Sequence, residues 1–302
     1  MNSIVFFGTE DFSLTALRTL VEADFPVVAV VTKPDSPKGR GHAIIPPAVK
    51  TYAETHGITV WQPQKLADIT DEIEKLDHPA GVLVSYGKII PQATLDLFTP
   101  GIINLHPSLL PKYRGPSPVE TAIAAGDKET GISIIKLIAA MDAGPIYRQI
   151  RIPLHGKETA EELYVELGRQ GSELLVETLP PILDGSLQPS NQADDATYCK
   201  LLSKDDGTIN WNTAAATIEA RIRAYHIWPQ SRTTLGDIDV IITAAEVIDS
   251  RDSIPGSLTV ENGSLIVGTG QDSLRILTLK PLGKKEMPVG AFLSGYHNHL
   301  GS

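Results

Sequence analysis

The chain has 302 residues, of which 42% are hydrophobic and 21% are charged, and it carries a net charge of −10. These proportions are typical of a globular protein and exclude a disordered or fibrous chain. The acidic balance argues against a nucleic-acid partner, so composition alone gives no reason to expect one.

Cysteine content and hydropathy indicate the cellular compartment. Cys199 is the single cysteine and can form no internal disulfide, so nothing calls for an oxidising environment. The apolar run Ile4–Phe7 is too short for a signal peptide, and no segment approaches the roughly 18 apolar residues of a membrane span. We therefore expect a cytoplasmic protein that needs no membrane.

The first half of the chain alternates short β-rich segments with helical patterns. Apolar residues at helical spacing predict a helix over 13–23, and Pro46-Pro47 predicts the start of a second helix that Gly57 ends. The predicted strands cover residues 4–7, 27–32, 58–61, 81–85, 102–105 and 132–137. Their uninterrupted apolar runs are typical of strands that are covered on both faces. This alternation predicts an α/β fold with a doubly wound, mostly parallel sheet.

The second half changes character near residue 187. Thr159 and Glu162 form the capping-box pattern that begins a long helix running toward Pro180-Pro181. Residues 188–206 are polar and rich in turn formers, which is typical of a linker.

Beyond this segment the pattern is that of a small β domain. A helix is predicted over 213–224, and short strands follow over 240–244, 256–260, 264–267 and 274–279. We predict an N-terminal α/β domain over 1–187, a linker over 188–206 and a smaller C-terminal β-barrel domain, OB-like, over 207–302.

The segment around His106 is the most informative part of the sequence. Asn104 and His106 are two residues apart at the end of a predicted strand, so their side chains project from the same face. Pro107 cannot continue a central strand, which places the pair at the C-terminal edge, where open α/β sheets bind ligands. An amide that stabilises an oxyanion beside an imidazole that moves a proton suits acyl transfer. The alternative is a structural, hydrogen-bonded histidine at a strand end.

A carboxylate follows the predicted strand over 132–137. Asp142 stands among small residues just before Ala143-Gly144, where aspartate commonly stabilises a turn. If this turn meets the end of the Asn104 strand, the carboxylate orients or polarises His106. Both interpretations are open at this point.

Several motifs together resemble the folate-dependent formyltransferase family. They are Asn104-x-His106-x-Ser108-Leu109-Leu110-Pro111, Tyr113-Arg114-Gly115, Gly126-Asp127-x-x-Thr130-Gly131 and Met141-Asp142-Ala143-Gly144. The resemblance implies catalytic roles for Asn104, His106 and Asp142. It also implies 10-formyltetrahydrofolate as the formyl donor and a wall for the reduced folate formed by Ser108, Leu109, Leu110 and Pro111. The eight histidines show no metal-ligand spacing, so we expect no metal.

Three further segments, 32–41, 201–229 and 283–295, resemble the branch of this family that formylates methionyl-tRNA. The first carries Lys33, Lys38 and Arg40 on a glycine-rich loop, and basic side chains of this kind bind phosphates. The resemblance implies tRNA contacts by Lys38, Arg40, His42, Lys284 and Lys285. His42 stands where this branch commonly has a lysine. The alternative for each segment is an ordinary solvated loop.

With Phe7-Gly8-Thr9 included, the resemblance covers nearly the whole chain. It implies an enzyme that transfers the formyl group to the α-amino group of methionyl-initiator tRNA. It implies no obligate protein partner, and a monomer is the default expectation. One alternative is a 10-formyltetrahydrofolate-dependent transferase or hydrolase that acts on a small molecule. The other is a tRNA- or folate-binding protein without turnover. The basic loop and C-terminal domain argue against the first alternative, and the intact Asn104, His106 and Asp142 argue against the second.

Overall fold

The computed structural model of the chain describes residues 2–38, 43–250 and 254–300. The described part forms two compact units. The first contains the residues up to Pro116, together with Thr130–Ile152 and Tyr164–Cys199. The second contains Ser117–Glu129, Pro153–Leu163 and the chain from Lys200 onward. None of the described helices is long and apolar enough to cross a membrane.

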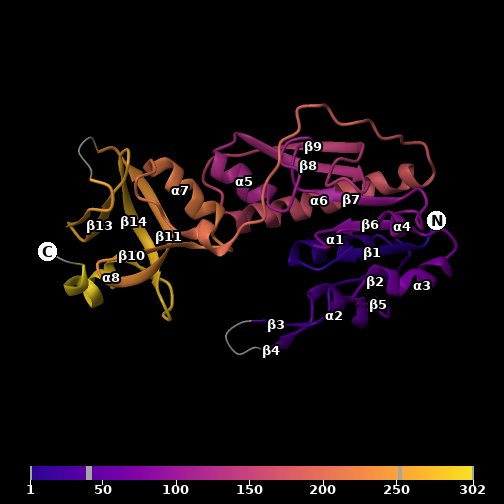
Figure 1. Cartoon of the computed structure of the whole chain (residues 1–302), viewed down its shortest axis with the longest axis horizontal. Helices are drawn as coiled ribbons and strands as arrows, with labels where there is room; N and C mark the ends of the chain where they lie inside the picture. The colour runs from indigo at the N-terminus through magenta and orange to yellow at the C-terminus, as the bar shows by residue number, and fades with distance from the viewer. Residues whose placement is uncertain (1, 39–42, 251–253, 301–302) are drawn as a thin grey trace. The chain divides into compact units, whose positions relative to one another are not determined.

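The first unit is built around a sheet in which seven strands pair within the described ranges (Figure 1). In sheet order they are β5 (Thr59–Trp61), β2 (Val27–Val31), β1 (Ile4–Gly8), β6 (Ala80–Val84), β7 (Ile102–His106), β8 (Glu129–Lys136) and β9 (Ile146–Pro153). The strands from β5 to β7 are parallel, whereas β8 runs antiparallel to β7. The carboxyl ends of the parallel strands therefore share one edge of the sheet.

Helices cover both faces of this sheet. Val5 and Phe7 of β1 pack on one face against η1 (Leu66–Ile69), α3 (Thr70–Glu74) and α4 (Gln92–Leu95). Ile102 of β7 belongs to this cluster, so Asn104 and His106 project from the same face.

The opposite face of the sheet is covered by α1 (Asp11–Glu22) and α6 (Ala160–Leu183). Gly171 of α6 lies against Leu105 of β7, and an added Cβ would be 3.0 Å from Leu105 Cδ1. Phe12 of α1 meets Tyr164 of α6 edge-on at 5.7 Å between ring centroids. Helix α2 (Ala48–Thr55) packs on α1. The predicted doubly wound, mostly parallel sheet is confirmed.

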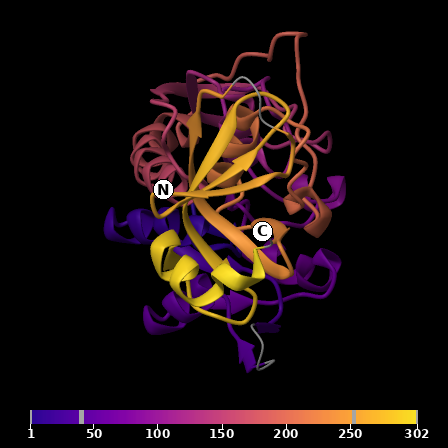
Figure 2. The same cartoon turned by 90° about the vertical axis from the view of Figure 1, so that its left-hand side faces the viewer.

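The second unit contains an antiparallel sheet in which six strands pair within the part of the chain that the structure describes. The strands are β10 (Ser231–Leu235), β11 (Ile238–Ile248), β14 (Ser273–Pro281), β13 (Ser264–Gly268), β12 (Leu258–Glu261) and β15 (Met287–Pro288). Figure 2 shows this sheet strongly twisted. Its core joins side chains of α7 (Ala215–Ala224) and α8 (Val289–Tyr296), with Phe292 fully buried. The predicted smaller C-terminal β domain is confirmed.

Two local features add to the expected elements. Helix α5 (Pro118–Ala125) packs against α7 inside the second unit, although it lies far from α7 in the sequence. The strands β3 (Ser36–Lys38) and β4 (Ala43–Ile45) form an antiparallel pair within the segment that the sequence indicated as a loop. The domain boundaries at 187 and 206 stay a prediction.

Candidate active site

Asn104 and His106 lie at the carboxyl end of β7, as the sequence predicts, and their exposed fractions are 4% and 5%. The Nε2 atom of His106 is 3.0 Å from the carbonyl oxygen of Tyr113. A carbonyl oxygen can only accept a hydrogen bond, so Nε2 carries a proton and donates it there. The Nδ1 atom is thereby left as the ring nitrogen that gains or loses a proton.

Asp142 lies on the turn after β8 and faces this pair of side chains. Its Oδ2 atom accepts the backbone N–H of Gly115 at 2.8 Å and lies 3.7 Å from His106 Nδ1. Its Oδ1 atom lies 3.5 Å from Asn104 Nδ2. The structure therefore brings an amide, an imidazole and a carboxylate together at one edge of the sheet. The carboxylate faces the ring nitrogen of His106 that the Tyr113 carbonyl oxygen leaves unused.

The segment from Ser108 to Pro111 follows His106 directly. Ser108 Oγ donates to the carbonyl oxygen of Lys112 at 2.6 Å, and Leu110 is buried. Ser133 Oγ donates to Ser108 O at 2.6 Å and accepts the N–H of Leu110 at 3.1 Å. These side chains hold the segment in place, and its main chain forms a fixed border beside the Asn104–His106–Asp142 cluster.

Leu109 and Pro111 are half-buried, in contrast to Ser108 and Leu110. Leu109 packs over Gly131, where an added Cβ would lie 2.4 Å from Leu109 Cδ2. Folate binding by the four residues stays a prediction.

The predicted tRNA-binding residues occupy two places in the sequence. Lys38 ends β3 and pairs with Ala43 of β4, whereas Arg40 and His42 lie outside the described residues. Lys284 and Lys285 are exposed on the turn between β14 and β15. Exposed cations on a turn suit phosphate contacts, and their role stays a prediction.

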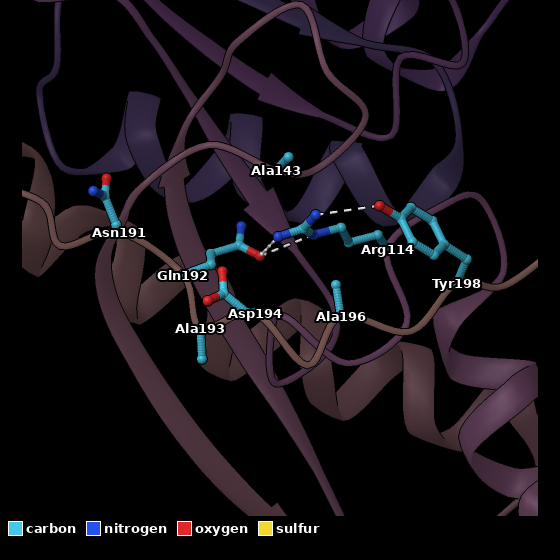
Figure 3. Close-up of a pocket in the computed structure, with 8 residues that line it drawn as sticks. All are labelled: Arg114, Ala143, Asn191, Gln192, Ala193, Asp194, Ala196 and Tyr198. Atoms are coloured by element: carbon cyan, nitrogen blue, oxygen red, sulfur yellow. Dashed lines mark hydrogen bonds between the residues drawn. The ribbon is translucent and has the colours of Figure 1, made fainter.

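A hollow of about 400 Å³ opens beside the Asp142 turn (Figure 3). It is lined by Arg114, Ala143, Asn191, Gln192, Ala193, Asp194, Ala196 and Tyr198. Most of these residues come from the segment that the sequence indicated as a linker. No local sequence pattern marks these residues, because their contacts with Arg114 and the Asp142 turn join residues far apart in the chain. Within the described ranges, no group of three His, Cys, Asp or Glu side chains could hold a metal ion.

Comparisons with known proteins assign the chain to a class. Residues 1–179 match the model of the family described as "Formyl transferase", and residues 201–297 match "Formyl transferase, C-terminal domain". The chain belongs to the formyl transferase family and is an enzyme with formyltransferase activity.

Curated relatives within this family carry a more specific name. A methionyl-tRNA formyltransferase of Thermodesulfovibrio yellowstonii is 38% identical, over 97% of this chain and 96% of the relative. The methionyl-tRNA formyltransferase of Herpetosiphon aurantiacus is 40% identical, over 97% of each chain.

Solved structures show the same fold at lower identity. An N-formyltransferase of Helicobacter canadensis, in complex with folinic acid and dTDP-3-aminofucose, matches with a TM-score of 0.69 and 18% identity, over 91% of this chain and 99% of that chain. HypX of Aquifex aeolicus matches with a TM-score of 0.68 and 16% identity. The match covers 99% of this chain but 50% of HypX, so this chain spans about half of that protein.

Proposed function

We propose that this protein transfers the formyl group of 10-formyltetrahydrofolate to the α-amino group of methionyl-initiator tRNA, as a monomer in the cytoplasm. The observation that carries the proposal is the meeting of Asp142 with Asn104 and His106 at the sheet edge. The relatives named methionyl-tRNA formyltransferase support the tRNA substrate, because their matches cover 97% of this chain and so include most of its C-terminal part.

The division of labour follows the predicted domains. Residues 1–187 perform the chemistry, 188–206 connect, and 207–302 bind tRNA together with the basic segment around Lys38. The fixed main chain of Ser108–Pro111 borders the reduced folate, which suits a flat ligand that must be held in one position. Lys284 and Lys285 contact phosphates from their exposed turn.

Formyl transfer to an amine places negative charge on the formyl oxygen, removes a proton from the amine and returns one to the departing nitrogen. Asn104 has a second amide N–H besides the one directed at Asp142, and it stabilises the charged oxygen together with protonated His106. His106 moves protons through Nδ1, because Tyr113 O occupies Nε2. Asp142 faces Nδ1 of His106 and orients the imidazole for this proton transfer.

The test measures formylation of charged initiator tRNA beside uncharged tRNA and free methionine. We expect formylated product only with the charged tRNA, and none with uncharged tRNA or free methionine. His106→Ala and Asp142→Ala should each lower kcat by about 10²–10³-fold, a typical effect of removing a catalytic donor. Near-normal turnover in both variants would refute the catalytic assignment, and equal formylation of free methionine would refute the tRNA assignment.

The tRNA contacts need a separate measurement. The double change of Lys284 and Lys285 to Ala should raise the KM for tRNA, leave the KM for folate unchanged, and reduce the dependence of tRNA binding on salt. Lys75→Ala, which removes an exposed lysine paired with Glu72 on α3, is the matched control. If the double variant and the control have the same KM for tRNA at every ionic strength, this turn does not bind tRNA.

A further inference from the structure

Gln192 contacts the turn that carries Asp142 from a segment that composition had indicated as a linker. Its Nε2 atom donates to the carbonyl oxygens of Asp142 and Gly144, both at 2.7 Å. Its Oε1 atom accepts Nε and Nη2 of Arg114 at 3.0 and 2.7 Å. Figure 3 shows the Gln192 amide and the Arg114 guanidinium directed at each other. The two donors and the two lone pairs of the amide are all used.

The turn requires such a support because its backbone is constrained. Asp142 has a φ of 46°, in the left-handed region that few residues other than glycine adopt. Gly144 lies so close to the preceding strand that an added Cβ would be 1.7 Å from the carbonyl oxygen of Lys136. Two carbonyl groups of this turn point at one side-chain amide. The position of the Asp142 carboxylate therefore depends on a main chain that Gln192 holds from outside.

Arg114 links Gln192 to the segment that contacts the Asp142 carboxylate directly. The residue that follows it, Gly115, donates the N–H that Asp142 Oδ2 accepts. The Arg114 main chain also bonds to the segment of Gln192, because its N–H donates to Thr197 O and its carbonyl oxygen accepts the N–H of Cys199, both at 2.9 Å. The Gln192 side-chain amide thus joins the turn that carries Asp142 to Arg114, the residue before the Gly115 N–H that Asp142 accepts.

We propose that Gln192 is a positioning residue for Asp142, so that this side chain sets the distance from the carboxylate to His106. The inference rests on the proposed catalytic role of Asp142. The chemistry requires an amide at this position, because one side-chain group must donate to two carbonyl oxygens through its nitrogen and accept from a guanidinium through its oxygen. A carboxylate could keep the contact with Arg114 but would face the two carbonyl oxygens without a proton to donate.

The decisive variants are Gln192→Glu, which keeps an acceptor for Arg114, and Gln192→Met, which keeps the size of the side chain and removes its hydrogen bonds. Both should lower kcat by about 10- to 100-fold, since small displacements of a catalytic group have effects of this size. The KM values for folate and tRNA should change less than threefold, and the pH profile of kcat/KM should shift. Gln188→Ala is the matched control, because its amide bonds to Gly185 O in the same segment. It should have wild-type kinetics.

A double-variant comparison separates positioning from a general loss of structure. If Gln192 acts through Asp142, Gln192→Met should change kcat less than twofold in a protein that already carries Asp142→Asn. A full additional loss in that background would overturn the inference, as would an unchanged kcat and pH profile in both single variants. If Asp142→Asn itself retains near-normal turnover, the proposed function fails first. If Asp142→Asn lowers kcat by about 10²–10³-fold while both Gln192 variants are normal, the positioning inference alone fails.

Discussion

The Gly115→Ala substitution tests how tightly the site is built. Gly115 has a φ of 118°, which residues with a side chain rarely adopt. An added Cβ would lie 2.5 Å from the carbonyl oxygen of Cys199 and 3.2 Å from its Sγ. The backbone must therefore move, and the N–H that Asp142 accepts moves with it.

The expected magnitude combines two effects. Backbone strain of this kind costs of order 1–3 kcal/mol, and forced repacking adds an effect of similar size. We expect Gly115→Ala to lower the free energy of unfolding by about 3 kcal/mol, and the melting temperature by about 6–12 °C. Weakening a hydrogen bond to a charged group, worth about 1.5–3 kcal/mol, should reduce kcat by about 10- to 100-fold.

Chemical denaturation and steady-state formylation kinetics measure these losses. Gly185→Ala is the control, because Gly185 has a φ of 78° but no atom lies within 4 Å of the added Cβ. It should cost about 1 kcal/mol, from backbone strain alone, and leave kcat unchanged. Equal stability losses in the two variants, or wild-type turnover in Gly115→Ala, would refute the argument from close packing.

Three further predictions concern stability. The Tyr86 hydroxyl is buried without a hydrogen-bond partner among the described residues, and burial raises its pKa to about 12. Above pH 10 the unfolded chain ionises at this position while the folded protein does not, so wild-type stability should fall by up to about 2–3 kcal/mol between pH 10 and 12 relative to Tyr86→Phe, measured by urea denaturation. Phe292→Ala should cost about 3–5 kcal/mol in the same assay, whereas Leu282→Ala, on a side chain that is 66% exposed, should change stability by less than about 0.5 kcal/mol. A hydrogen bond from Lys200 and two from Ser203 lower the pKa of Asp206 to about 2. Asp206→Asn should therefore lower the free energy of unfolding by about 1 kcal/mol at neutral pH, and the stability difference from wild type should disappear as the pH falls from 4 to 2. A constant stability difference over that range would contradict this assignment.

The sequence predicted the parts of the fold that depend on local pattern. The apolar run that ends at His106 and Pro107 marked β7 and its edge, and the capping box at Thr159 marked the start of α6. The short helices α3 and α4 were not predicted, because four or five residues do not establish a helical period. The sequence pattern also did not predict that β8 runs antiparallel to β7. Strand direction depends on the path of the connecting segment, and the local residues do not determine that path.

The site was predictable only for the residues whose chemical type is informative. Asn104, His106 and Asp142 stood out as an amide, an imidazole and a carboxylate next to predicted strand ends. Gln192 did not stand out, because a glutamine in a polar segment is ordinary and its role comes from contacts 48 and 50 residues away in sequence. Such a role depends on tertiary hydrogen bonds, which local propensity does not predict.

The Tyr113-Arg114-Gly115 motif gains a physical reason from the structure. Its first residue offers a carbonyl oxygen to His106 Nε2, its second a guanidinium to Gln192, and its third an N–H to Asp142. Two of these contacts use the main chain, so the side chain at 113 is not what fixes the imidazole. The third position must be glycine, because Cys199 O occupies the space where a Cβ would stand. A single three-residue stretch thus orients both members of the imidazole–carboxylate pair, and a shift of this stretch displaces the two together.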